Sequence, residues 1–110
     1  MAKNKLQGGP MNIEKIIEDQ GGIWTEDGWV VEGDLDLCNL NLTKLPKIYK
    51  VGGYFDCSHN KLTSLKGAPK EVGRSFWCTY NKLIYLKGAP EIVDGNLNNF
   101  VIPTPLNDTT

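Results

Sequence analysis

The sequence predicts a small solenoid. Short parallel strands form a sheet on one face, non-helical turns or 3₁₀ segments form the other face, and an α-helix with a β-hairpin caps the N-terminal end. The first observation is a repeat: "GGYFDCSHNKLTSLKGAPKEVG" (52–73) and "GRSFWCTYNKLIYLKGAP" (73–90) are nearly the same at an offset of 21 residues. A copy from Val31 precedes them at an offset of 20, and a partial copy begins at Val93. The second observation is the alternation of apolar and polar residues at the start of each copy, which is typical of a half-buried strand.

Residues 11–30 are predicted to form an N-terminal cap. The first copy needs a cap because a stack of repeats leaves its end open to water. Asn12 is a candidate N-cap residue, three isoleucines form an apolar stripe, and Gly21-Gly22 ends the helix. A hairpin is expected next around Asp27-Gly28. It brings Trp24 and Trp29 together as part of the cap core rather than as a ligand site.

The repeat itself covers residues 31–102, and alternation assigns its side chains to the interior or to the outward face. The inward set at the start of the copies is Leu35, Leu37, Phe55, Cys57, Phe76 and Cys78. The leucines that follow fill the interior, and Asn60 and Asn81 bury amides that bond to the backbone of neighbouring copies. The Gly-Ala-Pro segments 67–69 and 88–90 end the copies as tight turns.

Each copy follows F-x-C-x-x-N-x-L, or L-x-L in the first copy, which matches the L-x-L-x-x-N-x-L core of leucine-rich repeats. The segment "FDCSHNKLTSLKGAPKEVG" resembles the short leucine-rich repeats of tailed bacteriophages and bacteria, and is similar to those of bacterial effector ubiquitin ligases. The resemblance implies a leucine-rich-repeat solenoid. It does not carry over the ligase activity, because the sequence shows no further domain for a catalytic cysteine.

The two ends are expected to differ from the repeats. Residues 1–10 are a flexible leader or a cloning remnant, and residues 103–110 are a C-terminal tail whose prolines cannot extend a strand ladder. Phe100, Val101 and Ile102 are expected to close the last copy.

Composition narrows the class of protein. No apolar run is long enough to span a membrane and the N-terminus lacks a secretory signal, so we expect a cytoplasmic protein, in the host cytoplasm if a phage encodes it. Three cysteines without a C-x-x-C pair predict neither a zinc site nor a disulfide framework, and no metal or other cofactor is expected. The net charge of −1 conceals an asymmetry: residues 11–36 hold eight acids and one base, whereas residues 37–110 hold nine bases and five acids.

Catalysis is not expected. The sequence contains one histidine, His59, close to Asp56 and Ser58, but immediate neighbours on a strand do not converge on opposite imidazole nitrogens as a triad requires. Nucleic acid is not an expected partner either. The lysines of the repeats lie in the turns and on the convex side, whereas the strand face carries Asp34, Asp36 and Asp56, which repel phosphates.

The outward strand face is the predicted functional surface. Four strands would present one column of Asp36, Asp56, Trp77 and Asn98 and a second of Asp34, Tyr54, Ser75 and Asn96. These positions vary between copies while the interior stays constant, which suggests that folding does not constrain them: they serve recognition or have drifted. The candidate partner-binding residues are Asp36, Tyr54, Asp56, His59, Trp77 and Tyr80.

Three functions remain open. The first is a non-enzymatic protein-interaction module, such as a phage or bacterial protein that binds and inhibits or modulates a host protein. The second is sequestration of a small molecule or nucleotide. The third is a self-assembling virion component, for which a homo-oligomer is expected.

Overall fold

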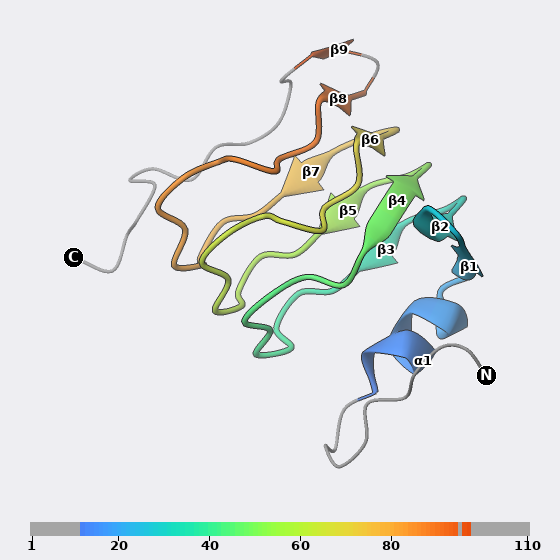
Figure 1. Cartoon of the computed structure of the whole chain (residues 1–110), viewed down its shortest axis with the longest axis horizontal. Coiled ribbons are helices and arrows are strands. Elements are labelled where there is room, and N and C mark those ends of the chain that lie inside the picture. Colours follow the sequence, from blue (N-terminus) through green and yellow to red (C-terminus); the bar gives the residue numbers. More distant parts are fainter. Residues whose placement is uncertain (1–11, 95, 98–110) are drawn as a thin grey trace.

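The computed structural model describes residues 12–94 and 96–97, which form a small α/β structure with mostly parallel strands (Figure 1). The helix α1 spans Ile13–Asp19. The strands are β1 (Ile23–Thr25), β2 (Gly28–Val31), β3 (Leu35–Asp36), β4 (Ile48–Val51), β5 (Phe55–Asp56), β6 (Glu71–Val72), β7 (Phe76–Trp77), β8 (Ile92–Val93) and β9 (Asn96–Leu97). The predicted leader, the closing residues 100–102 and the tail lie outside the described residues. In the part of the chain that is described, no helix has the length and apolarity to cross a membrane.

The predicted N-terminal cap is present. The Asn12 Oδ1 accepts hydrogen bonds from the backbone N–H groups of Glu14 and Lys15 at 3.1 and 3.2 Å, as an N-cap residue does. The helix ends before Gly21, whose φ of 92° is the left-handed conformation that glycine adopts without a steric penalty.

The hairpin of β1 and β2 places Trp24 opposite Trp29, with ring centroids 5.5 Å apart in an edge-to-face arrangement. Its turn is formed by Glu26 and Asp27, one residue earlier than predicted. Trp29 is 3% exposed and belongs to the core, but Trp24 is 43% exposed, so the prediction of a buried pair is wrong for Trp24.

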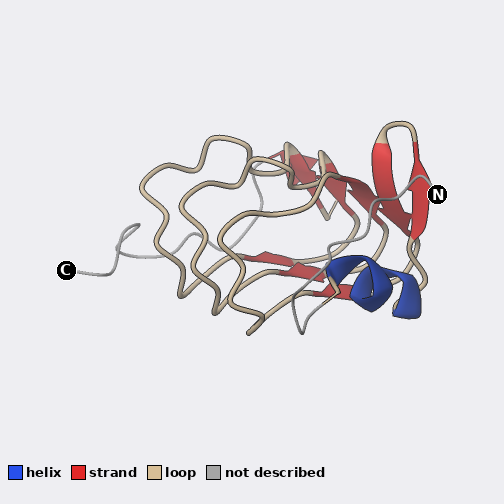
Figure 2. Cartoon of the chain, turned by 60° about the horizontal axis from the view of Figure 1, so that its bottom comes forward, coloured by secondary structure: helices blue, strands red, loops and turns tan. Residues whose placement is uncertain are grey.

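The strands form two sheets that face each other across the core (Figure 2). The smaller sheet has the order β3-β5-β7 and is wholly parallel. Its register pairs Leu35 with Phe55 and Phe55 with Phe76, which are the predicted offsets of 20 and 21. The sequence predicted this sheet and the β1-β2 hairpin, but not the strands β4, β6 and β8 that extend the hairpin into a second sheet of order β1-β2-β4-β6-β8-β9.

A close backbone approach explains how the chain passes from the larger sheet to the smaller one. A Cβ at Gly73 would lie 2.0 Å from the Gly52 carbonyl oxygen, and a Cβ at Gly52 would lie 2.3 Å from the Glu32 carbonyl oxygen. Only glycine fits at these two corners, so consecutive copies can stack with their backbones in contact.

The interior consists of columns of equivalent residues. Val31, Val51, Val72 and Val93 form the column under the larger sheet, and Leu35, Phe55 and Phe76 form one under the smaller sheet. The rings of Phe55 and Phe76 stack with centroids 5.7 Å apart and an interplanar angle of 18°. The predicted inward set is confirmed as fully buried.

The predicted burial of the two asparagines is also confirmed. The Asn60 Oδ1 accepts from the N–H groups of Leu40 and Leu42, and its Nδ2 donates to the carbonyl oxygens of Leu37, Cys57 and Ser58. Asn81 repeats the arrangement one copy later, accepting from Leu62 N–H and donating to Cys57, Cys78 and Thr79. Each side chain therefore satisfies buried backbone groups of its own copy and of the preceding copy.

The prediction that the fourth copy extends the smaller sheet is wrong. β9 turns back and pairs antiparallel with β8, with Val93 opposite Asn96, so that it belongs to the larger sheet. The sequence at this turn is Asp94-Gly95, the composition of a two-residue hairpin, and Asp94 has a φ of 57°. The local turn preference prevails over the repeat. Asn98, predicted to continue an outward column, lies outside the described residues.

Replacing Asn60 by Ala is expected to lower the free energy of unfolding by about 2–4 kcal/mol, because five hydrogen bonds to buried backbone groups lose their partner. Chemical denaturation of the purified variant measures this change. The control is Lys61→Ala at the neighbouring exposed position, which should change stability by less than about 0.5 kcal/mol. Equal effects of the two substitutions would contradict the structural role of Asn60.

Candidate functional site

All six predicted site residues lie on or at the end of the smaller sheet. Asp36, Asp56 and Trp77 belong to β3, β5 and β7, and successive members are register neighbours. Tyr54 precedes β5, and His59 and Tyr80 follow β5 and β7. The structure groups them as two aromatic pairs and one acidic cluster.

The first aromatic pair is Tyr54 and Trp77, whose ring centroids are 5.5 Å apart at an interplanar angle of 54°. Both side chains are half-buried. The Asp34 Oδ1 accepts a hydrogen bond of 2.9 Å from the Tyr54 N–H, so the preceding copy fixes the backbone that carries the ring. Desolvation and the nearby carboxylates of the acidic residues on this face raise the pKa of the Tyr54 phenol above its ordinary value.

The second pair is His59 and Tyr80, stacked with centroids 4.4 Å apart and an interplanar angle of 12°. Tyr80 is 63% exposed. Both residues occupy the left-handed region, with φ of 58° and 57°, as does their counterpart Asn39 in the first copy, with φ of 62°. The prediction that folding does not constrain these positions is therefore wrong.

The conformation at this position suits glycine and asparagine, and histidine is also enriched in it, whereas it costs a tyrosine about 1–2 kcal/mol. The first copy has the suitable residue, whereas the second and third copies carry large exposed rings. Folding stability alone does not account for this choice, because strained residues persist where the surroundings or a function require them.

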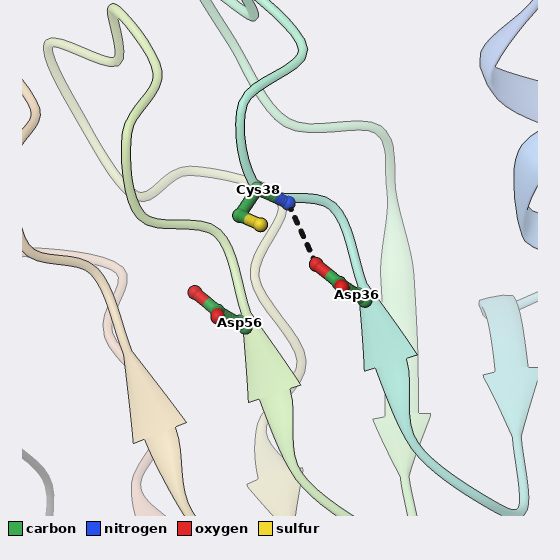
Figure 3. Close-up of side chains that lie close together, drawn as sticks. All are labelled: Asp36, Cys38 and Asp56. Carbon is green, nitrogen blue, oxygen red and sulfur yellow. Dashed lines mark hydrogen bonds between the residues drawn. The ribbon is translucent and has the colours of Figure 1, made fainter.

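The acidic cluster consists of Asp36, Cys38 and Asp56, whose nearest ligand atoms all lie within 4.8 Å of one another (Figure 3). The Asp36 Oδ1 accepts from Cys38 N–H at 3.0 Å. The Asp56 Oδ1 accepts from the Ser58 N–H at 3.0 Å and from the Ser58 hydroxyl. Ser58, predicted to face outward, is consequently only 6% exposed.

The cluster keeps its thiol protonated. A hydrogen bond to Asp36, partial burial, and the negative charges of Asp36 and Asp56 raise the pKa of Cys38 to about 11. One oxygen of each carboxylate accepts a hydrogen bond from the backbone N–H group two residues on, which fixes both carboxylates beside the thiol. The arrangement therefore presents negative charge and a neutral thiol to the surface.

The edge of the smaller sheet at β3 is closed by a side chain. The Gln20 Oε1 accepts from Asp36 N–H at 2.7 Å, and the Gln20 Nε2 donates to the Asp36 carbonyl oxygen at 3.0 Å. The amide thus takes the place of a neighbouring strand at this position, which protects the edge from pairing with another chain. At this position the smaller sheet therefore exposes outward side chains rather than unpaired backbone groups.

Sequence reasoning found which residues share the face but missed three that organise it. Asp34 holds the backbone at Tyr54, Cys38 completes the acidic cluster, and Gln20 closes the edge. An Asp two residues before Cys38 and before Ser58 is a local signal for the two turns. The contact of Gln20 with β3 has no such local signal, because it joins the cap to the first copy.

Comparisons of this chain with protein-family models, with curated proteins and with solved structures found no match.

Asp36→Asn is expected to speed alkylation of Cys38 by iodoacetamide near neutral pH by about tenfold, because removing the negative charge lowers the pKa of the thiol and raises its thiolate fraction. Cys57 and Cys78 are not expected to be alkylated, since they are buried and burial raises the pKa of both thiols. Mass spectrometry of the labelled protein measures the rate at each cysteine. Asp27→Asn, in the hairpin turn, is the matched control and leaves the Cys38 rate unchanged. An equal rate in the wild-type and Asp36→Asn proteins would show that Asp36 does not control the thiol.

Proposed function

We propose that the chain is a short leucine-rich-repeat solenoid and a non-enzymatic interaction module, which binds a protein partner through the outward face of the smaller sheet. The observation that carries the proposal is the pair of aromatic contacts, Tyr54 with Trp77 and His59 with Tyr80. Exposed or half-buried aromatic residues grouped on one face are typical of binding hot spots. The strained backbone at Tyr80 adds support, because asparagine at this position would satisfy the fold.

The chemistry of the face favours a cationic partner segment. Asp34, Asp36 and Asp56 supply carboxylates at the ends of the aromatic contacts, and aromatic faces attract Lys and Arg side chains. With Gln20 on the β3 edge, we expect recognition through side chains rather than through an added strand. Three strands about 4.8 Å apart make a narrow surface, which suits a peptide or loop of the partner.

The resemblance to phage and bacterial repeats extends the proposal to where the protein acts and to the kind of protein it binds. A host-directed protein that acts in the cytoplasm, and that inhibits or modulates a host enzyme or defence protein, fits a small binding module of this kind. The other two functions from the sequence are sequestration of a small molecule or nucleotide and a self-assembling virion component. A virion component would bind further copies of itself, through this face or through an open end of the stack, and light scattering coupled to size exclusion would show it as a defined oligomer.

The binding test uses the immobilised full chain to capture partners from host extract, with quantitative mass spectrometry as the readout. A double variant, Trp77→Ala with Tyr80→Asn, is expected to retain less than about a tenth of a specific partner, because both aromatic contacts are lost. Tyr85→Ala removes an equally exposed ring away from the face and serves as the matched control. Retention of the same partner by the double variant would reject this face as the site. Release of the partner at raised salt is expected if carboxylates contribute.

A stability comparison at Tyr80 tests whether the ring is kept for binding. Tyr80→Asn is expected to unfold within about 1 kcal/mol of the wild-type protein, because relief of the left-handed backbone offsets the lost stacking. Tyr80→Ala loses the stacking and keeps the strain, so it should be less stable than Tyr80→Asn by about 1 kcal/mol. Denaturant titration of both variants measures the difference. A Tyr80→Asn protein destabilised by several kcal/mol would mean that the ring serves the fold.

A further inference from the structure

A second feature lies away from the smaller sheet, over the segments that lead into β4 and β6. It is a cleft of about 760 Å³, formed by residues 43–45 and 47–49 of the first copy, residues 63–64, 66–68 and 70 of the second copy, and Asp27 from the hairpin turn. This volume is in the range of sites that hold small organic ligands. None of the six residues proposed for partner binding lines it.

The cleft is positively charged. Lys44 and Lys47 come from the first copy and Lys66 and Lys70 from the second, against the single carboxylate of Asp27. All four lysines are exposed, and none forms an ion pair with a carboxylate of the described residues. Their ammonium groups are thus available to an anion. Four like charges around one cleft also repel each other, and a bound polyanion relieves this repulsion.

The rest of the lining is of two kinds. Thr43, Thr63 and Ser64 bring hydroxyl groups that can donate to phosphate oxygens, as lysine ammonium groups do. The apolar part is formed by buried Leu45 and Ile48 together with Ala68, and the half-exposed ring of Tyr49 stands beside it. An aromatic ring next to an apolar floor is suited to a flat ligand ring.

The backbone around the cleft is closely packed, so the site does not depend on a loose loop. Gly67 has a φ of 99°, and a Cβ there would lie 2.6 Å from the Pro46 carbonyl oxygen. The N–H of Trp29 donates to the Lys47 carbonyl oxygen at 3.0 Å, which attaches the hairpin to the same segment. Lysines of two copies and the hairpin carboxylate are therefore held on one rigid frame.

We propose that this cleft binds an organic phosphate of the nucleotide class. The phosphates lie among the four lysines and the hydroxyl groups, and the base lies on Tyr49 and the apolar floor. Asp27 accepts a hydrogen bond from a ligand hydroxyl or amino group. The site is independent of the partner-binding face, so that each can fail without the other.

Isothermal titration of the 110-residue chain with ATP, tripolyphosphate and adenosine tests the proposal. ATP is expected to bind more tightly than either fragment, and more weakly as salt is raised. Lys44→Gln with Lys66→Gln should weaken ATP binding by about tenfold or more, through loss of two charge-assisted contacts. Lys61→Gln with Lys82→Gln changes the net charge equally at exposed lysines outside the cleft, and should change the affinity less than about twofold. Tyr49→Ala should weaken ATP and leave tripolyphosphate unchanged.

Several results would overturn the proposal. The proposal is wrong if ATP does not bind at millimolar concentration, or if the two double-lysine variants lose the same affinity for ATP. It is also wrong if tripolyphosphate binds as tightly as ATP and Tyr49→Ala does not change ATP binding. A single-stranded oligonucleotide that binds far more tightly than ATP, and responds to both lysine pairs, would instead assign the lysines to a general nucleic-acid surface. Trp77→Ala with Tyr80→Asn should bind ATP as the wild-type protein does, which separates this test from that of the partner face.

Discussion

The buried amides of Asn60 and Asn81 are the interaction on which the rest of the structure depends. Where each copy leaves the smaller sheet, the chain turns inside the molecule and its backbone groups lose water as a partner. An amide offers both an acceptor and donors at one point, so it can satisfy N–H and C=O groups of two consecutive copies together. A leucine cannot do this, and the first copy, with Leu40 at the equivalent position, receives its bonds from Asn60. Successive copies are thereby fixed in register, and the columns of valine, leucine and phenylalanine follow from that register.

Once the register is fixed, the interior positions and the surface positions are subject to different constraints. Inward positions accept only side chains that fill a column, whereas outward positions are free to differ in chemistry between copies. The two sheets use this freedom differently: the smaller sheet presents carboxylates and aromatic rings, and the segments before the larger sheet present lysines. One small chain thus carries two surfaces of opposite charge. The backbone still limits the choice locally, since the positions of His59 and Tyr80 require a left-handed conformation.

The sequence predicts those features that local patterns determine. The period gave the register of the smaller sheet, alternation gave its inward residues, and Asn12 marked the start of the helix. The strands that extend the predicted hairpin into the larger sheet were missed, because two residues, such as Glu71–Val72, are too few to show alternation, and β4 buries its first and last residues rather than every second one. The reversal after β8 was not predicted because residues 93–97 match the repeat, whereas the local Asp94-Gly95 sequence favours a hairpin turn. Which outward residues share a face could be foreseen, but ring contacts and the convergence of lysines depend on side-chain positions across copies.

Amide hydrogen exchange under native conditions tests the central role of the asparagines most directly. The N–H groups of Leu42 and Leu62 donate to the Oδ1 atoms of Asn60 and Asn81 and to no strand. If the amides hold the copies together, these two protons exchange as slowly as those of Leu37 and Cys57, which directly follow β3 and β5 and donate to the neighbouring strand, because all require global unfolding to open. Exchange as fast as that of the exposed loop residues Thr63 and Ser64 would contradict the account.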